Sequence, residues 1–557
     1  MALPRFDESE GLNMDVGKAR LVMVLHSHVP WVMGCGRWPF GEEWVYEIAW
    51  SCYLPLIRCF RRLAADGIPA NVTLSVTPVL MEQLASCEFR QGFISYLGDR
   101  KLRVIEDRSA FQRDGKHELA ALTRWAEGLL DAAAQEFENL GRDIPRELAR
   151  LAAQGSIELM TSAATHPYLP LLRRDLSRRL QVNAGKAMFR RIAGLNPQGF
   201  WLPECAYSPG LEWVIQEAGY SYTVLDAAAL QGSRPGLREG ARRSRAGHST
   251  YTGSGGSDGS SSRVARRPGS RGYGSGAWMQ PDPGGGRPLD RVYMLADSSV
   301  AAFVRHTELC SQVWSRWIGY PGDFEYREFH VQSPVSGMRY HRVTDANGDL
   351  GSKQPYRPDA AVAKARAHAA HMLQKVRLAA ERSNSNTPVL TLAFDTELFG
   401  HWWFEGPVFL EHLIRLAASD DELEVRTGSQ VVGRLPALGA GRIQARESSW
   451  GEGSDHSVWM NERSLPMWER IWELEDGLEQ VYPRLSAKAG ADDDGGPLWP
   501  DDPFGAEDDA NALIREFLLA TASDWEFLLY TGTASSYPKL RFETHAPACE
   551  DLLRRLA

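Results

Sequence analysis

The stretch QGFWLPECAYSPGLEWVIQEAGYSYTVLD, residues 198–226, places two strand-like segments on either side of a helix-like one. The apolar run GFWLP and the β-branched and aromatic run YSYTVL favour strands, whereas GLEWVIQEAG is typical of a short amphipathic helix. Strands that alternate with helices form parallel sheets, either open or closed into a barrel. This stretch therefore predicts an α/β fold.

The same alternation extends in both directions from this stretch. Further strands are predicted within residues 21–25, 70–80, 156–163, 290–297 and 389–395, and a helix over 186–194 precedes the quoted stretch. Apolar residues at helical spacing from about 87 to 154 predict a helical insertion after the second strand.

Three regions depart from this alternation. Residues 231–289 are rich in Gly, Ser, Arg and Pro and cannot form a core, so we expect a mobile surface loop there. A shorter acidic loop is expected at 489–505, and helices dominate from about residue 439. We predict a barrel formed by 1–86 and 156–438, a helical insertion at 87–155, and a helical C-terminal domain at 439–557.

Composition restricts the class of protein. The chain has 557 residues and a net charge of −9, which argues against nucleic acid or an anionic membrane as the main partner. Its seven cysteines are scattered without CxxC spacing, the first 20 residues do not resemble a signal peptide, and no apolar run reaches the length of a membrane span. We expect a cytoplasmic enzyme. The 18 tryptophans, several beside carboxylates, are also typical of sugar-binding clefts.

Candidate catalytic residues lie where predicted strands end, because chemistry in parallel α/β folds takes place there. They are His26, His28, Glu158, Thr165, His166, Glu204, Asp226 and Asp395. Glu204 and Asp395 match the two carboxylates that glycoside chemistry requires, one to protonate the leaving oxygen and one to attack the anomeric carbon or activate water. Asp395 could equally bind a metal, and Asp226 could cap a helix.

The histidines allow more than one interpretation. The pair in HSH, His26 and His28, could bind a metal with Asp226 or His166, hydrogen-bond to sugar hydroxyls, or serve structure alone. Because the spacing fixes no third ligand, we predict neither a metal nor a cofactor.

Several blocks resemble glycoside hydrolase family 57, and most closely its 1,4-α-glucan branching enzymes. They include HSHVPWV (26–32), GSIELMTSAATHPYLPLL (155–172), WLPECAY (201–207), LTLAFDTELFGHWWFEGP (390–407) and SSWGEGSDHSVWMN (448–461). The resemblance implies a (β/α)7 barrel with an inserted helical domain and a helical C-terminal domain. It also implies a retaining enzyme that acts on α-glucans such as amylose, amylopectin or glycogen.

The resemblance assigns roles to individual residues. Glu204 would be the nucleophile and Asp395 the general acid/base, with His26, His28 and His166 lining the glucose subsite. The aromatic subsite residues would be Trp38, Trp314, Trp403, Trp450 and Trp459. In such enzymes a lid loop carries a tyrosine that controls water, and the corresponding segment, 231–289, offers Tyr251 and Tyr273.

Other functions remain open at this stage. An α-amylase or 4-α-glucanotransferase of the same family would use the same residues with a different acceptor, and a lid that fails to exclude water would raise hydrolysis. A non-catalytic glucan-binding protein would be expected to lack Glu204 or Asp395, and the sequence has both. A metal-dependent deacetylase or mannosidase-like enzyme would need a His/Asp metal cluster. An unrelated barrel enzyme would not explain the matching blocks.

Overall fold

A computed structural model describes residues 18–37, 40–231, 234–235, 287–315, 318–345, 349–438, 440–488, 508–532 and 536–557. Its strands are β1 (Ala19–Ser27), β2 (Val72–Val76), β3 (Ile157–Ser162), β4 (Gly199–Trp201), β5 (Tyr222–Leu225), β6 (Arg234–Pro235), β7 (Tyr293–Leu295), β8 (Ala301–Val304), β9 (Val389–Asp395), β10 (Leu423–Val425) and β11 (Gly441–Gln444).

The helices alternate with these strands in the first part of the chain and then follow one another. They are α1 (Glu42–Ile48), α2 (Leu54–Ala65), α3 (Pro78–Ala85), α4 (Cys87–Arg113), α5 (His117–Asn139), α6 (Ile144–Ala153), α7 (Asp175–Ala193), α8 (Leu211–Glu217), α9 (Thr307–Trp314), α10 (Pro358–Glu381), α11 (Gly406–Ala418), α12 (Gly428–Val432), α13 (Leu435–Leu438), α14 (Leu465–Lys488), α15 (Asp509–Ala520), α16 (Asp524–Thr531) and α17 (Ser536–Leu556).

Seven of the described strands close into a parallel ring. β1 pairs with β2, and the ring continues through β3, β4 and β5 to β8. β9 pairs with the other edge of β1. A parallel bridge between Arg305 and Thr391, just beyond β8 and within β9, completes the circle. The predicted (β/α)7 barrel is therefore confirmed.

One predicted barrel strand was misplaced. The segment 290–297 contains β7, but β7 runs antiparallel to β8 and pairs on its other edge with β11, outside the ring. The sixth barrel strand is β8, the short run AAFV. A tight turn separates the two strands, and Ala296 in it has a φ of 46°. Because the apolar pattern of β7 is stronger than that of β8, the sequence pattern indicated the first strand of this hairpin instead of the second.

The barrel interior is a packed apolar core below a polar rim. Val22, Met160, Trp201, Phe303 and Ala393 from five different strands are all fully buried there. Because bulky side chains fill the barrel, substrate can bind only beyond the carboxyl ends of the strands.

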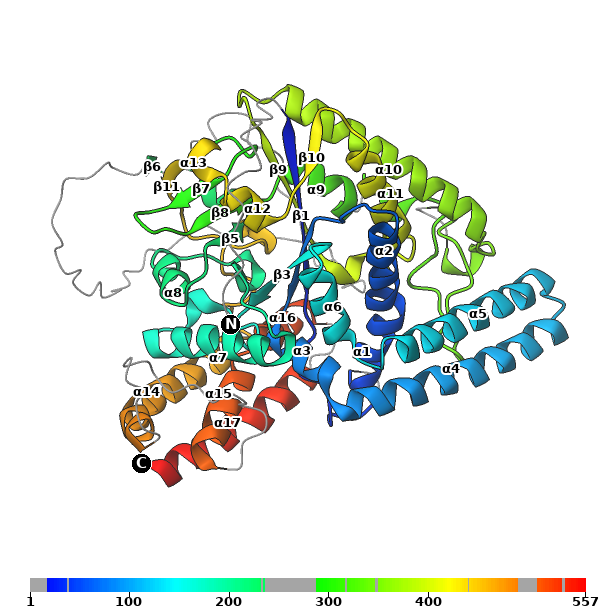
Figure 1. Ribbon diagram of the computed structural model, residues 1–557. Helices are drawn as coiled ribbons and strands as arrows, with labels where there is room; N and C mark the ends of the chain where they lie inside the picture. The colour runs from blue at the N-terminus through cyan, green and yellow to red at the C-terminus, as the bar shows by residue number, and fades with distance from the viewer. Residues whose placement is uncertain are drawn as a thin grey trace, which may run out of the picture.

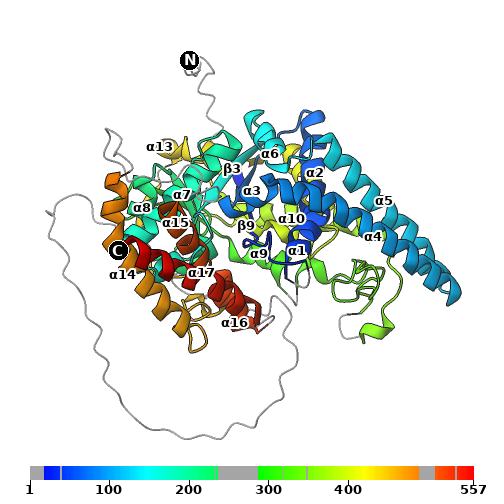
Figure 2. The ribbon, with the colours of Figure 1, turned by 90° about the horizontal axis from the view of Figure 1, so that it is seen from below.

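Two groups of helices extend from the barrel (Figure 1). Helices α4 and α5 lie side by side and project from one side of the molecule, within the stretch predicted to be helical from 87 to 154. The segment 318–345 packs against α4, where Asp107 accepts hydrogen bonds from Ser333 and Tyr340. Helices α14 to α17 gather on the opposite side (Figure 2). The division into domains at 87, 156 and 439 stays a prediction.

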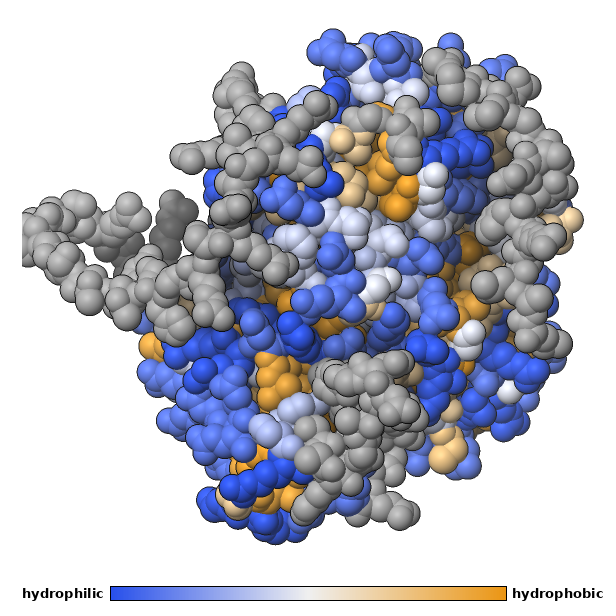
Figure 3. Space-filling model, turned by 60° about the vertical axis from the view of Figure 1, so that its left-hand side comes forward, coloured by the Kyte–Doolittle hydropathy of each residue, from blue (hydrophilic) through white to orange (hydrophobic). Residues whose placement is uncertain are grey.

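Among the described residues on the face drawn in Figure 3, hydrophobic ones form separate patches between hydrophilic ones. Among the described helices, none combines the length and the apolar character that crossing a membrane requires.

Candidate active site

The turn after β4 holds Glu204 in an unusual backbone conformation. Glu204 and Cys205 have φ angles of 62° and 47°, a region that side chains other than glycine enter at a cost of about 1 kcal/mol or more per residue. The segment 448–450 clamps this turn, because Tyr207 and Ser448 exchange backbone hydrogen bonds and the Trp450 amide donates to the Glu204 carbonyl. The strained backbone lowers the stability of the fold, and the hydrogen bonds around it fix the position of the Glu204 carboxylate.

Each oxygen of the Glu204 carboxylate accepts one hydrogen bond from the C-terminal part of the chain. Trp450 Nε1 donates to Oε2 at 2.8 Å, and Ser523 Oγ donates to Oε1 at 3.1 Å. Burial, helped by the nearby carboxylate of Asp524, raises the pKa of Glu204 to about 7 against the opposing effects of Trp450, His28 and Ser523. Glu204 is therefore a largely buried carboxylate, with 15% of its side chain exposed, whose ionised form accepts hydrogen bonds from two donors.

Asp395 is the last residue of β9 and lies beside His26 of β1 in the strand register. Burial raises the pKa of Asp395 well above its ordinary value, and the carboxylates of Glu397 and Glu204 raise it further. A carboxyl group that keeps its proton near neutral pH can act as a general acid.

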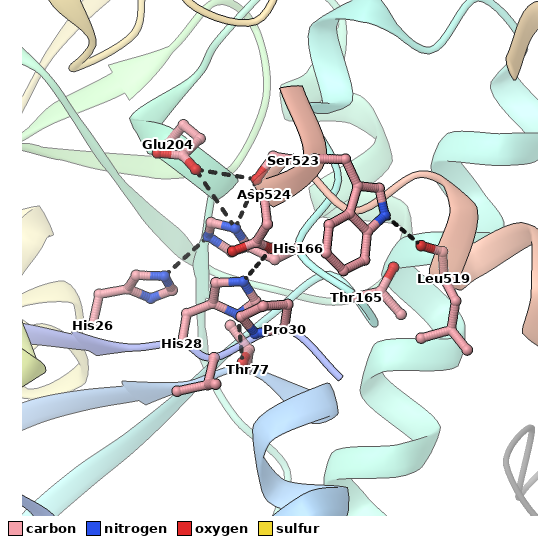
Figure 4. A network of polar contacts seen from close by, with 12 residues as sticks. His26, His28, Pro30, Thr77, Thr165, His166, Glu204, Leu519, Ser523 and Asp524 are labelled. Carbon is pink, nitrogen blue, oxygen red and sulfur yellow. Dashed lines mark hydrogen bonds and ion pairs between the residues drawn. The ribbon is translucent and has the colours of Figure 1, made fainter. Parts of the chain in front are cut away.

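The three histidines gather beside Glu204 (Figure 4). His26 and His166 are joined through their Nε2 atoms at 3.0 Å, and His166 Nδ1 lies 3.1 Å from Ser523 Oγ. Burial lowers the pKa of both residues well below 6.5. The rings of His28 and His166 stack with their centres 4.0 Å apart. The predicted histidine cluster therefore exists, and its site is shared with α16.

His28 differs from the other two histidines in its charge. Its Nε2 atom lies 2.8 Å from Asp524 Oδ2, and its Nδ1 atom 3.1 Å from Thr77 Oγ1. Burial lowers the pKa of His28, but the carboxylates of Asp524, Glu204 and Glu397 together outweigh burial, so the net shift of this pKa is upward. The Asp524 carboxylate thus favours the protonated form of the His28 ring beside Glu204.

A third carboxylate, that of the buried residue Glu397, follows two residues after Asp395. Its Oε1 atom accepts hydrogen bonds from Tyr53 Oη at 2.5 Å and from the His28 amide at 3.2 Å. Burial raises the pKa of Glu397 to about 7. The site therefore contains closely coupled acids that disfavour one another's ionisation.

Two candidates from the strand ends have structural roles. Asp226 accepts a hydrogen bond from the Ala228 amide, as a helix cap does, and forms a buried ion pair with Arg305 at 2.6 Å. Glu158 accepts hydrogen bonds from Tyr222 Oη at 2.7 Å and from the Ser429 amide at 3.0 Å. Thr165, in the same turn as His166, donates to the Leu518 carbonyl and so ties the barrel to α15.

The tryptophans predicted to form aromatic subsites differ in their contacts and in their exposure. Trp450 touches Glu204, and Trp314 is partly buried with its ring 6.3 Å from that of Trp402. Trp403 and Trp459 are each 1% exposed, so neither ring has an open face for a sugar in this conformation. Their role in the subsites stays a prediction. Trp38 and the lid candidates Tyr251 and Tyr273 lie outside the described residues.

Ser523, Asp524, Tyr53 and Glu397 were not singled out from the sequence. Ser523 and Asp524 begin α16 and read as ordinary helix-start residues, and Ser523 is 319 residues from Glu204. The only local signal was the motif DTELFG, in which Glu397 shares a turn with Asp395.

One set of side chains has the composition of a metal site. His28, His166 and Asp524 each offer a ligand atom, and these atoms lie within 4.8 Å of one another. However, the two rings stack at only 21°, so their in-plane lone pairs run nearly parallel and do not converge on a common point. Their nitrogens also take part in hydrogen bonds, so the geometry fits a polar network better than an ion.

Comparison with known proteins identifies the class to which this fold and site belong. Residues 22–443 match the model of glycosyl hydrolase family 57, and residues 503–557 match that of the C-terminal region of 1,4-alpha-glucan branching enzymes. The first match covers most of the chain, and the protein belongs to glycosyl hydrolase family 57.

Several relatives carry the same enzyme name. A 1,4-alpha-glucan branching enzyme of Thermococcus kodakarensis is 35% identical over 95% of this chain and 72% of its own length. A probable 1,4-alpha-glucan branching enzyme of Mycobacterium tuberculosis is 30% identical over 96% of this chain and 92% of its own.

Solved structures of branching enzymes have a fold similar to that of this chain. The crystal structure of the Thermococcus enzyme has a TM-score of 0.79 at 32% identity, covering 96% of this chain and 90% of its own. That of a Pyrococcus horikoshii branching enzyme has a TM-score of 0.77 at 30% identity, covering 95% and 88%. An alpha-amylase of Thermotoga maritima shares the fold, with a TM-score of 0.74 at 24% identity, covering 97% and 93%.

Proposed function

We propose that this chain is a retaining 1,4-α-glucan branching enzyme in which Glu204 is the nucleophile and Asp395 the general acid/base. The observation that supports these roles most directly is the pair of carboxylates in the turn after β4 and at the end of β9. Glu204 has two donors to its ionised form, and Asp395 lies where burial and neighbouring acids keep a proton on its carboxyl group.

The reaction has two displacement steps at one anomeric carbon, from opposite faces of the sugar, so that two inversions retain its configuration. Asp395 gives its proton to the oxygen of an α-1,4 bond while Glu204 attacks the anomeric carbon, so the bond breaks and the chain is held as a glucosyl ester. A glucan 6-hydroxyl then attacks the same carbon and passes its proton to Asp395. Glu204 leaves as a carboxylate, and an α-1,6 branch is formed.

Branching rather than hydrolysis is favoured by the part of the chain that holds the nucleophile. Ser523, which donates to Glu204, and Asp524, which pairs with His28, belong to the region that matches the branching-enzyme C-terminal model. The start of α16 therefore lies against the Glu204 carboxylate, where it reduces the access of water to the glucosyl ester.

The same proposal covers substrate and compartment. We take amylose, amylopectin or glycogen as the donor and acceptor glucans. All seven cysteines are free, including five that are buried, which fits the reducing cytoplasm.

The decisive experiment compares the wild type with Glu204→Gln on amylose. Proton NMR counts α-1,6 linkages, and a reducing-sugar assay counts hydrolysis. We expect branches to outnumber new reducing ends in the wild type, and Glu204→Gln to lose both signals by about 10⁴-fold or more. Glu217→Gln, which alters an exposed carboxylate on α8, serves as the matched control.

Each other outcome has a clear meaning. Reducing ends without branches would make the protein an α-amylase with the same catalytic pair. New, longer α-1,4 chains without branches would make it a 4-α-glucanotransferase. Full activity of Glu204→Gln would contradict the assignment of the nucleophile.

A further inference from the structure

A continuous chain of hydrogen bonds runs from the barrel wall to the Glu204 carboxylate. It begins at Ser75 of β2, whose Oγ lies 3.1 Å from His26 Nδ1. It continues from His26 Nε2 to His166 Nε2 at 3.0 Å, and from His166 Nδ1 to Ser523 Oγ at 3.1 Å. It ends where Ser523 Oγ donates to Glu204 Oε1 at 3.1 Å, as the dashed lines from His26 onward show in Figure 4.

The four side chains that lead to Glu204 in this row of hydrogen bonds are shielded from water. Ser75 and Ser523 are fully buried, and His26 and His166 are 1% and 2% exposed. Water therefore cannot substitute for a missing partner, and each donor must face an acceptor. A backbone hydrogen bond from the Ser523 amide to the His166 carbonyl, at 3.0 Å, fixes the spacing of the last link.

The direction of donation follows from the last link. An ionised carboxylate only accepts, so Ser523 gives its proton to Glu204 and must accept from His166 Nδ1. Burial keeps both histidines neutral, and a neutral imidazole has one donor and one acceptor nitrogen. His166 Nε2 therefore accepts from His26 Nε2, and His26 Nδ1 accepts from Ser75 Oγ.

We propose that Ser75 and Ser523 are positioning residues for the nucleophile, because the one-way chain Ser75–His26–His166–Ser523 aims a hydroxyl proton at Glu204 Oε1. Ser75 touches no reacting atom and acts through three intervening side chains. Without its proton, His26 can adopt the other tautomer, and the chain can reverse. Ser523 would then present a lone pair, instead of a proton, to the carboxylate.

Other charged and titratable groups also face Glu204 and set the background for this effect. They are His28 and His166 beside the barrel mouth, Asp524 and Glu526 on α16, Tyr168 after β3, Cys205 in its own turn and Asp395 on β9. Among the described residues, none of these groups donates a hydrogen bond to Oε1, whereas Ser523 does. The hydrogen bond from the Ser523 hydroxyl is thus the stabilisation of the Glu204 carboxylate that depends on the row of hydrogen bonds from Ser75.

The inference rests on the proposed role of Glu204, but its first test does not depend on activity. Nitrogen-15 NMR of histidine-labelled protein at pH 8 reports which ring nitrogen carries the proton. We expect the Nδ1–H tautomer for His166 and the Nε2–H tautomer for His26. The opposite assignment at either ring would overturn the proposed direction, even if Glu204→Gln is inactive as expected.

The second test uses four variants. Ser523→Ala is expected to lower kcat about 10- to 100-fold, and Ser75→Ala about 3- to 10-fold, with KM changed less than kcat. Because both remove support for the ionised carboxylate, the acid limb of the pH profile moves to higher pH. Ser523→Thr, which keeps a hydroxyl, restores most of the activity.

Ser162→Ala is the matched control, since Ser162 is a fully buried serine at the end of β3 whose hydroxyl donates to the Trp201 carbonyl, outside the chain. A Ser75→Ala variant with the same pH profile as Ser162→Ala and the wild-type histidine tautomers would contradict the proposal. If Ser75→Ala fails to fold, the tautomers of the wild type decide. Loss of all activity in Glu204→Gln with unchanged serine variants would leave the proposed function standing and remove only this inference.

Discussion

At the scale of single residues, the protonation of Glu204 controls when the enzyme works. Its pKa of about 7 exists because burial outweighs the hydrogen bonds from Trp450 and Ser523. Trp450→Phe keeps most of the ring but removes the donor to Oε2, so the pKa rises further. We expect kcat/KM at pH 7 to fall about 10- to 100-fold, with a smaller loss at pH 8.

The check is a pH profile of kcat/KM from pH 5 to 9 for both proteins. Trp213→Phe, at a tryptophan on α8 that is 41% exposed, gives the matched control. An acid limb that stays at its wild-type position in Trp450→Phe would mean that the indole does not support the ionised carboxylate.

Glu204 should also lower the free energy of unfolding near neutral pH. Because the pKa of Glu204 is raised from about 4.5 to about 7 on folding, the folded state binds more protons than the unfolded state between these values. The free energy of unfolding therefore falls as pH rises through this window. Glu204→Gln cannot ionise, so its Tm should exceed that of the wild type by a margin that grows from pH 5 to pH 8. Thermal unfolding at several pH values tests this, and a constant margin would contradict it.

At the scale of the elements, the Asp226–Arg305 pair joins the ends of β5 and β8. Both side chains are almost fully buried, with about 5% of each residue exposed. Arg305→Met leaves the Asp226 carboxylate without its cation, which costs about 3–5 kcal/mol of unfolding free energy. The double variant Asp226→Asn with Arg305→Met should recover a large part of this loss, since it removes the buried charge as well.

Urea unfolding of the wild type, the two single variants and the double variant forms the thermodynamic cycle that measures this coupling. The surface pair Arg179–Glu217, with both side chains about half exposed, provides a comparison cycle in which the coupling should stay below about 1 kcal/mol. Equal coupling energies in the two cycles would show that the buried pair has no special role.

The accuracy of the sequence predictions also varies by element. β1, β3 and β9 were predictable because each is a continuous apolar run ending in polar residues. β8 was missed because four residues, AAFV, give a weaker pattern than the neighbouring β7, and only the closure to β9 distinguishes a barrel strand from its hairpin partner. That Glu204 and Asp395 lie near strand ends at one rim could be predicted from the apolar runs that precede them. Their catalytic roles came from the resemblance and stay a proposal.

At the scale of the whole molecule, the active site is shared between the barrel and helices far along the chain. No local pattern predicts that Ser523 will meet Glu204, because their contact depends on how α15 and α16 dock on the barrel. That docking is carried in part by Gln181 of α7. Its side-chain nitrogen lies 2.9 Å from Thr165 Oγ1 and 2.8 Å from Thr521 Oγ1, and its oxygen accepts from the Thr165 amide at 3.1 Å.

Gln181→Leu should therefore uncouple the two parts without touching the reacting atoms. The leucine fills a similar volume but removes the acceptor of the Thr165 amide and the donor to the Thr165 and Thr521 hydroxyls. We therefore expect α15 and α16 to open more often and to admit water to the glucosyl ester. We expect faster hydrogen exchange in residues 508–532 and a higher ratio of reducing ends to α-1,6 branches, while α4 and α5 exchange as before. The control is Gln216→Leu, which removes a glutamine of α8 whose side-chain oxygen accepts a hydrogen bond from the Ser299 amide. If exchange quickens in α15 and α16 while the product ratio stays constant, the C-terminal helices hold the nucleophile but do not exclude water, and the preference for branching must arise elsewhere in the cleft.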